Sequence, residues 1–138
     1  MSIVQTQTTS FKQELYQAVH NLSSDTIYIA LYTGDANLNA DTTAYTSSNE
    51  VVASGYTAGG QALTGVSISS SGYTAYVNWS NVSWTAALTA RCALIYNVTQ
   101  GNKSIAVIDF GADKTSTTTF TITMPANTAT TALIRSSN

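Results

Sequence analysis

The chain has 138 residues, of which 43% are hydrophobic and only 9% charged, and its five basic and seven acidic residues give a formal net charge of −2. This length suits one ordinary domain, and the charge balance offers neither a basic surface for nucleic acid nor a polybasic patch for a membrane. Serine and threonine together supply 40 residues. A polar surface that carries hydroxyls more than ions is a poor basis for general acid–base catalysis.

Residues 1–9 show no helical or strand periodicity, and we expect an extended arm that is available for contacts with neighbouring molecules. The same residues lack the basic start and the apolar core of a secretory leader, so we expect none. Ile3 and Val4 are the apolar residues of this arm, and we assign them to an interface.

A single amphipathic helix over residues 11–22 is predicted to follow the arm. Ser10 is a suitable N-cap, and Gln13 completes a capping box. We expect His20 on the solvated side of this helix. The predicted apolar face consists of Phe11, Leu15, Val19 and Leu22.

From residue 26 onwards the pattern is typical of β-structure. Residues 26–32 are β-branched and aromatic, which predicts a strand buried on both faces, and a long polar loop follows at 33–50. Turn residues separate the later segments into two predicted hairpins. The further strands are expected at 62–69, 73–79, 89–98, 103–110, 118–124 and 129–135, with a short extended piece at 82–85.

These short strands predict a mainly β fold, an antiparallel β-sandwich or jelly-roll-like domain with one N-terminal α-helix. No internal repeat or shift in composition marks a second domain, so we expect residues 10–138 to form one domain.

The segment SGYTAGGQAL, residues 54–63, has the glycine density of a phosphate-binding loop. A phosphate cradle leads into a helix and usually carries a lysine or a G-x-G-x-x-G pattern. Here a predicted strand follows, neither pattern is present, and no basic residue lies between Lys12 and Arg91. We therefore expect a structural corner.

A weak calcium motif lies in the polar loop, where side-chain oxygens alternate along the chain. The sixth position of this motif is Ala40 rather than glycine, and the twelfth is Thr46 rather than glutamate. Local turns stabilised by Asn and Asp are the expected alternative. The candidate ligands are Asp35, Asn37, Asn39 and Asp41.

No other pattern of reactive residues stands out. Cys92 is the single cysteine, which excludes an intramolecular disulfide and a multi-cysteine zinc site, and His20 is the single histidine. We expect no catalytic residue, no cofactor and no metal. Trp79 and Trp84 could form an interface or a sugar-binding platform, or they could belong to the core.

The order of segments resembles a group of small virion proteins encoded in the structural gene clusters of tailed bacteriophages. The similarity extends from about Phe11 to Gly111, and none of its motifs is catalytic. It rests on SFKQEL, DTIYIALYT, TTAYTSSNEV, GYTAGGQAL, VNWSNVSW, LTARCALIYN and VIDFG.

This resemblance implies a structural part of the virion, assembled in the cytoplasm of the bacterial host. The leading expectation is a capsid decoration (cement) protein that binds the major capsid protein and stabilises the mature head, as a homo-oligomer with a trimer favoured. The alternatives are a tail, neck or fibre-associated protein and a carbohydrate-binding module that uses Trp79 or Trp84. The expected partners include neither nucleic acid nor a membrane.

Overall fold

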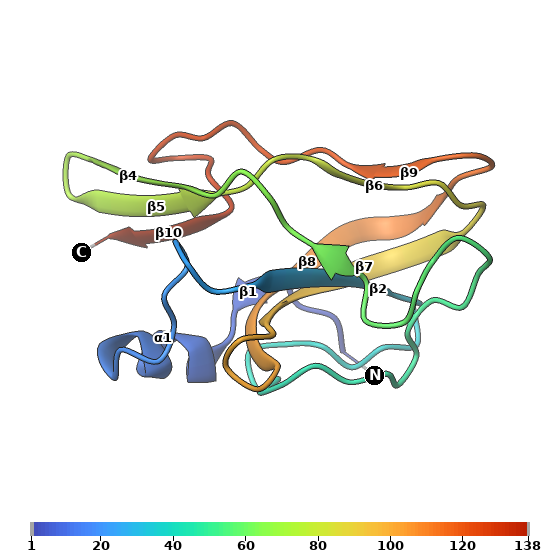
Figure 1. The fold of residues 1–138 in the computed structure, drawn as a ribbon, viewed down its shortest axis with the longest axis horizontal. Helices are drawn as coiled ribbons and strands as arrows, with labels where there is room; N and C mark the ends of the chain where they lie inside the picture. The colour runs from blue at the N-terminus through green and yellow to red at the C-terminus, as the bar shows by residue number, and fades with distance from the viewer. Residues whose placement is uncertain (1, 138) are drawn as a thin grey trace.

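The computed structural model describes residues 2–137, and it contains one short helix and antiparallel sheets in two facing layers (Figure 1). The first layer is a five-stranded sheet of order β1–β8–β7–β2–β3. Its strands are β1 (Thr6–Gln7), β8 (Lys103–Thr115), β7 (Thr89–Asn97), β2 (Ile27–Tyr32) and β3 (Gln61–Ala62).

The second layer consists of two small sheets, of order β10–β5–β4 and β6–β9. All pairs of named strands are antiparallel, so the predicted mainly β fold with a sandwich-like arrangement is confirmed. The strands of this layer are β4 (Ser67–Ser71), β5 (Thr74–Asn78), β6 (Val82–Trp84), β9 (Phe120–Ile122) and β10 (Ile134–Ser137).

The alternation of side chains along the central strands produces two apolar clusters. On β2, Ile29 and Leu31 belong to the main core, whereas Ala30 and Tyr32 point to the opposite face. This second face is covered by residues 33–50, which run below the sheet in Figure 1. The strand is therefore buried on both faces, as predicted, because the polar loop supplies its own apolar side chains, Ala36 and Leu38.

The prediction of an extended N-terminal arm is corrected by the structure. Thr6 and Gln7 form β1 on the edge of β8, and Ile3 forms a bridge with Leu38. Thr8 is fully buried, and its backbone N–H donates to Ile105 O at 2.9 Å. Backbone hydrogen bonds to the sheet and to the long loop thus fix a segment that shows no periodicity of its own.

The helix differs from the predicted 11–22 at both ends. α1 spans Thr9–Tyr16, and its N-cap is Thr8, whose side chain accepts from the backbone N–H of Phe11 at 3.3 Å. The cap lies two residues before Ser10 because Thr8 directly follows β1, and its backbone N–H is bonded to Ile105 O of the sheet.

The helix ends early because Ala18 adopts a left-handed conformation, with φ 57°. The backbone N–H of Val19 then donates to Glu14 O, and that of Ala18 donates to Leu15 O. This pair of bonds is the Schellman motif, which satisfies the last carbonyls of a helix.

Both predicted hairpins are confirmed, and the strand ends are shifted. β4 pairs with β5 and β7 pairs with β8. β8 continues beyond residue 110 to Thr115, with a shift of register between Ala90 and Cys92. The last strand begins at Ile134 rather than at residue 129, because the preceding threonines form hydrogen-bonded turns.

Candidate functional site

The glycine-rich corner is held by a buried carboxylate, Glu50, which the sequence analysis did not single out. Glu50 is 7% exposed and accepts three hydrogen bonds. Tyr45 Oη donates to Oε1 at 2.6 Å, Tyr56 Oη donates to Oε2 at 2.6 Å, and the backbone N–H of Gly59 donates to Oε2 at 2.7 Å. All three donors are neutral, so this buried charge is stabilised by hydrogen bonds rather than by a cation.

The same corner approaches the sheet so closely that only glycine fits at position 60. A Cβ atom on Gly60 would lie 1.8 Å from Ile29 O, and the residue has φ 80°. Tyr56 Oη also accepts from the backbone N–H of Leu31 at 2.9 Å. The corner is therefore structural, as predicted: it leads into β3, and its free backbone groups bind the protein itself.

Four tyrosines near Glu50 are resistant to ionisation. Burial raises the pKa of Tyr32, Tyr45 and Tyr56 well above the ordinary value, and the negative charge of Glu50 raises it further. Burial, with the same charge, raises the pKa of Tyr96 to about 12. At neutral pH these hydroxyls act as hydrogen-bond donors, and none of them is positioned as a base.

His20 is buried, so the prediction of a solvated histidine is wrong. Its ring packs against Phe11, with centroids 5.0 Å apart. Nδ1 accepts from Asn97 Nδ2 at 3.0 Å, which leaves the proton on Nε2 to be donated to Glu14 Oε1 at 2.9 Å. The ring thus connects the helix to β7, and no hydroxyl or thiol nucleophile is bonded to it.

Asn97 extends this connection to a second carboxylate. Its Nδ2 also donates to Asp25 Oδ2 at 2.9 Å, and Asp25 accepts the backbone N–H of Asn21 at 3.0 Å. Burial acts to raise the pKa of Asp25, but the hydrogen bonds from Asn21, Asn97 and Gln100 outweigh it and lower the pKa below the ordinary value. The whole network ties the segment after α1 to the end of β7.

The four calcium candidates do not converge on one point. Asn39 Oδ1 accepts from the backbone N–H of Asp41, and Asn39 Nδ2 donates to Asn37 Oδ1. Asp35 lies outside the small depression lined by the other three. Across residues 2–137, no group of three His, Cys, Asp or Glu side chains is placed to hold a metal ion. The loop uses its oxygens in local turns.

The four interface candidates fall into two groups. Trp79 and Trp84 are each 5% exposed and belong to the main core, which is one of the alternatives that the sequence left open. Neither residue therefore presents its ring to a sugar or a protein. Val4 is 48% exposed and remains available, while Ile3 is half-buried against the second cluster.

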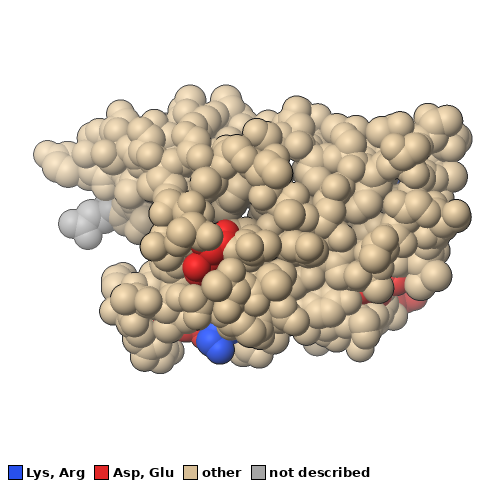
Figure 2. Space-filling model, viewed as in Figure 1, with Lys and Arg blue, Asp and Glu red and all other residues tan. Residues whose placement is uncertain are grey.

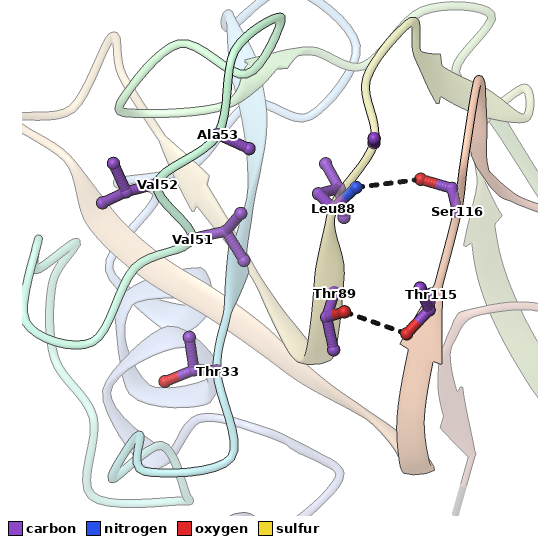
Figure 3. Close-up of a pocket in the computed structure, with 9 residues that line it drawn as sticks. Thr33, Val51, Val52, Ala53, Leu88, Thr89, Thr115 and Ser116 are labelled. Atoms are coloured by element: carbon purple, nitrogen blue, oxygen red, sulfur yellow. Dashed lines mark hydrogen bonds between the residues drawn. The ribbon is translucent and has the colours of Figure 1, made fainter.

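A groove of about 460 Å³ lies between the segment 51–53 and the start of β7 (Figure 3). Val51 and Ala53 point towards Leu88 and Thr89 across it, whereas Val52 points away and is 96% exposed. β2 leaves the sheet after Tyr32, which is opposite Cys92, and this departure opens the groove. The sequence patterns did not reveal the groove.

The hydroxyls of the groove are engaged with each other and with the backbone. Thr89 Oγ1 lies 2.9 Å from Thr115 Oγ1, and Ser116 Oγ donates to Ala86 O at 2.7 Å. The remaining lining residues are Thr33 and aliphatic side chains, and no lining residue is charged. Such a groove suits a neutral, partly apolar segment of a protein, and it offers no acid or base.

Six of the nine residues that line the groove lie in a stretch of 40 consecutive residues, 51–90, that contains no charged side chain. This uncharged run includes β3, β4, β5 and β6, together with the exposed side chains of Val52, Ile68 and Tyr73. Figure 2 shows how sparse charges are on one face of the molecule.

No family model, no curated protein and no solved structure matches this chain. None of the helices in the described part of the chain has the length and apolar character needed to cross a membrane.

Proposed function

We propose that this chain is a non-enzymatic structural protein of a tailed-bacteriophage particle, and that it binds the assembled head shell as a decoration protein. The observation that carries the proposal is the uncharged run 51–90, which supplies one wall of the groove and part of the other. The order of sequence segments, which resembles small phage virion proteins, gives the proposal its biological setting.

A decoration protein needs a rigid body and a surface that fits a repeated lattice. Here the two layers share a core, and the polar groups around Glu50 and His20 bind within the molecule. A protein that binds only the assembled lattice stabilises that lattice by mass action, and many identical contacts add to one another. The partner in this proposal is the major capsid protein.

We assign the contact with the shell to the groove and to Val52 beside it. A nearly fully exposed valine next to a neutral groove is an apolar contact that a partner can bury. The hydroxyls of Thr89 and Thr115 at the rim add neutral hydrogen-bonding groups.

The location of the chain in purified particles tests the function. Quantitative mass spectrometry and electron cryomicroscopy should find hundreds of copies on the outer surface of the head. Tens of copies in a tail or neck ring would overturn the decoration proposal and favour the tail alternative. Absence of the chain from the particles would overturn both.

The contact surface is tested by replacing each of two exposed valines with aspartate, one beside the groove and one far from it. Val52→Asp places a charge beside the groove and should abolish co-sedimentation with mature shells that lack the protein. Val98→Asp makes the same change at the opposite end of β7, where Val98 is 38% exposed, and should leave binding intact. Equal binding by both variants would overturn the assignment of the shell contact to Val52 and the groove edge beside it.

A further inference from the structure

We propose that the free edge of β4 pairs with β4 of a second copy of this chain, across a two-fold axis at Ser69. The pairing would join two three-stranded sheets into one six-stranded sheet. This inference goes beyond the proposed function and holds whatever surface the groove binds.

The other strand edges are short or protected. β1 and β3 have two residues each, β6 and β9 have three each, and Gln61 Nε2 donates to Ser83 O on β6. The part of β8 beyond its pairing with β1 carries Asp109, Asp113 and Lys114. β10 carries the charge of Arg135, and Gln7 Nε2 donates to Arg135 O at 2.9 Å. Charged side chains and short strands are the usual means by which proteins protect sheet edges.

β4 is neither short nor charged, and its contact from another segment is confined to its first residue, where Ser67 Oγ accepts from Asn127 Nδ2 at 2.9 Å. It has five residues, SISSS, and Ile68, Ser69, Ser70 and Ser71 are all exposed. It contains no charge, no proline and no shift of register against β5, and it lies within the uncharged run. A second β4 therefore meets no electrostatic repulsion as it approaches this edge.

The turn of the hairpin determines which backbone groups are free. Gly72 and Tyr73 form a two-residue loop, with Gly72 at φ 59°, so Ser71 and Thr74 close the hairpin as a hydrogen-bonded pair. Because the pattern alternates, Ser69 also bonds to β5, and the N–H and C=O groups of Ile68 and Ser70 point to the free edge.

These four groups are self-complementary. In an antiparallel β4–β4 pair centred on Ser69, Ile68 of each copy lies opposite Ser70 of the other. Each such pair exchanges two hydrogen bonds, so all four free groups of each copy find a partner. A contact of this kind is isologous and closes at two copies.

Ile68 gives an independent reason for a partner at this edge. Ile68 lies beside Val77, which packs against the main core, so Ile68 is on the inner face of its sheet. It is nevertheless 54% exposed, because no strand follows β4. A second β4 would cover part of this isoleucine, and burial of apolar surface would add to the backbone hydrogen bonds.

The arrangement leaves the groove free. The β4–β5 turn and the start of β7 lie at opposite ends of the long axis in Figure 1. A dimer joined at β4 would therefore present two grooves, one at each far end. The two-fold contact predicts an even number of copies, in place of the trimer that the sequence resemblance favours.

Cysteine pairing tests the register. Sedimentation equilibrium of the unmodified chain should show a dimer in the micromolar range. Ser69→Cys should form an intermolecular disulfide with oxidised glutathione, because the two Cα atoms across the axis lie about 4.5 Å apart. Ser71→Cys is the matched control, since its two copies would lie about 14 Å apart and could not be bridged.

Charge pairing tests the same contact without a covalent bond. Ser69→Lys and Ser69→Asp should each be monomeric with an unchanged melting temperature, and a mixture of the two should restore the dimer. Ser136→Lys, on the protected edge β10, should remain dimeric. A monomeric unmodified chain, equal disulfide yields at positions 69 and 71, or a dimer that survives Ser69→Lys would each overturn the proposal.

Discussion

Glu50 connects three segments through one buried carboxylate, and its removal tests how much that connection contributes to stability. Glu50→Ala leaves the hydroxyls of Tyr45 and Tyr56 and the N–H of Gly59 without their acceptor. We expect the free energy of unfolding in urea to fall by about 3 kcal/mol, because unsatisfied buried donors are costly. Asp113→Asn, at an exposed acid, should change it by less than about 0.5 kcal/mol.

A double-mutant cycle separates this network from simple loss of packing. Tyr45→Phe should destabilise the native chain and have much less effect in the Glu50→Ala background, because its partner is already absent. Equal effects of Tyr45→Phe in the two backgrounds would contradict the assignment of Glu50 as a shared acceptor.

The tyrosines around Glu50 predict a limit of stability at high pH. Tyr32, Tyr45, Tyr56 and Tyr96 keep their protons in the folded chain at a pH where the unfolded chain has lost them. The folded state then binds more protons, so the free energy of unfolding decreases as pH rises above about 10. Absorbance at 295 nm should show these four ionising together with unfolding. Their ionisation in a chain that remains folded by circular dichroism would contradict the prediction.

The residues that the sequence left unassigned are those whose partners are distant along the chain. His20 bonds to Asn97, 77 residues away, and Glu50 is held partly by tyrosines whose positions follow no period. A pattern search detects spacing along one element, so it recognised the glycines at 59 and 60. It could not show that Glu50 binds beside them.

At the scale of elements, the end of α1 offers a direct test of backbone conformation. Ala18 is exposed, and its left-handed φ of 57° is strained for a residue with a Cβ atom. Ala18→Gly should raise the free energy of unfolding by roughly 0.5–1 kcal/mol, measured in urea. Ala112→Gly, at an exposed position of β8 without a positive φ, should lower it by a similar amount. A loss of stability in both variants would argue against the Schellman motif.

The strands could be predicted more completely than the helix, for a physical reason. The β-branched and aromatic composition of residues 26–32 located β2, and turn residues located the β4–β5 and β7–β8 hairpins, because both signals are local to the segment that they specify. The apolar spacing of Leu15, Val19 and Leu22 suggested a longer helix. Leu15 is 40% exposed, and Leu22 reaches the core from the segment beyond the helix.

At the scale of the whole molecule, a second cover on the five-stranded sheet distinguishes this fold from a simple two-layer sandwich. Residues 33–50 place Ala36 and Leu38 on the face that the other strands leave open. Ile3 and Leu38 bridge the N-terminal segment to this loop. The polar composition of 33–50 predicted a loop correctly, but two isolated apolar residues gave too little signal to predict that it covers a sheet.

Because the molecule carries few charges, we expect its binding to a partner to depend only weakly on salt concentration. Among residues 2–137 the pair of permanently charged side chains in contact is Arg91 with Asp109, and the groove has no charged lining residue. Salt screens interactions between charges and leaves neutral contacts largely unaffected. Binding to head shells should therefore change by less than about threefold between about 0.05 and about 0.5 M NaCl, measured by co-sedimentation. A steep loss of binding across this range would show that the shell contacts a charged surface instead, and the groove would then have to be abandoned as the contact.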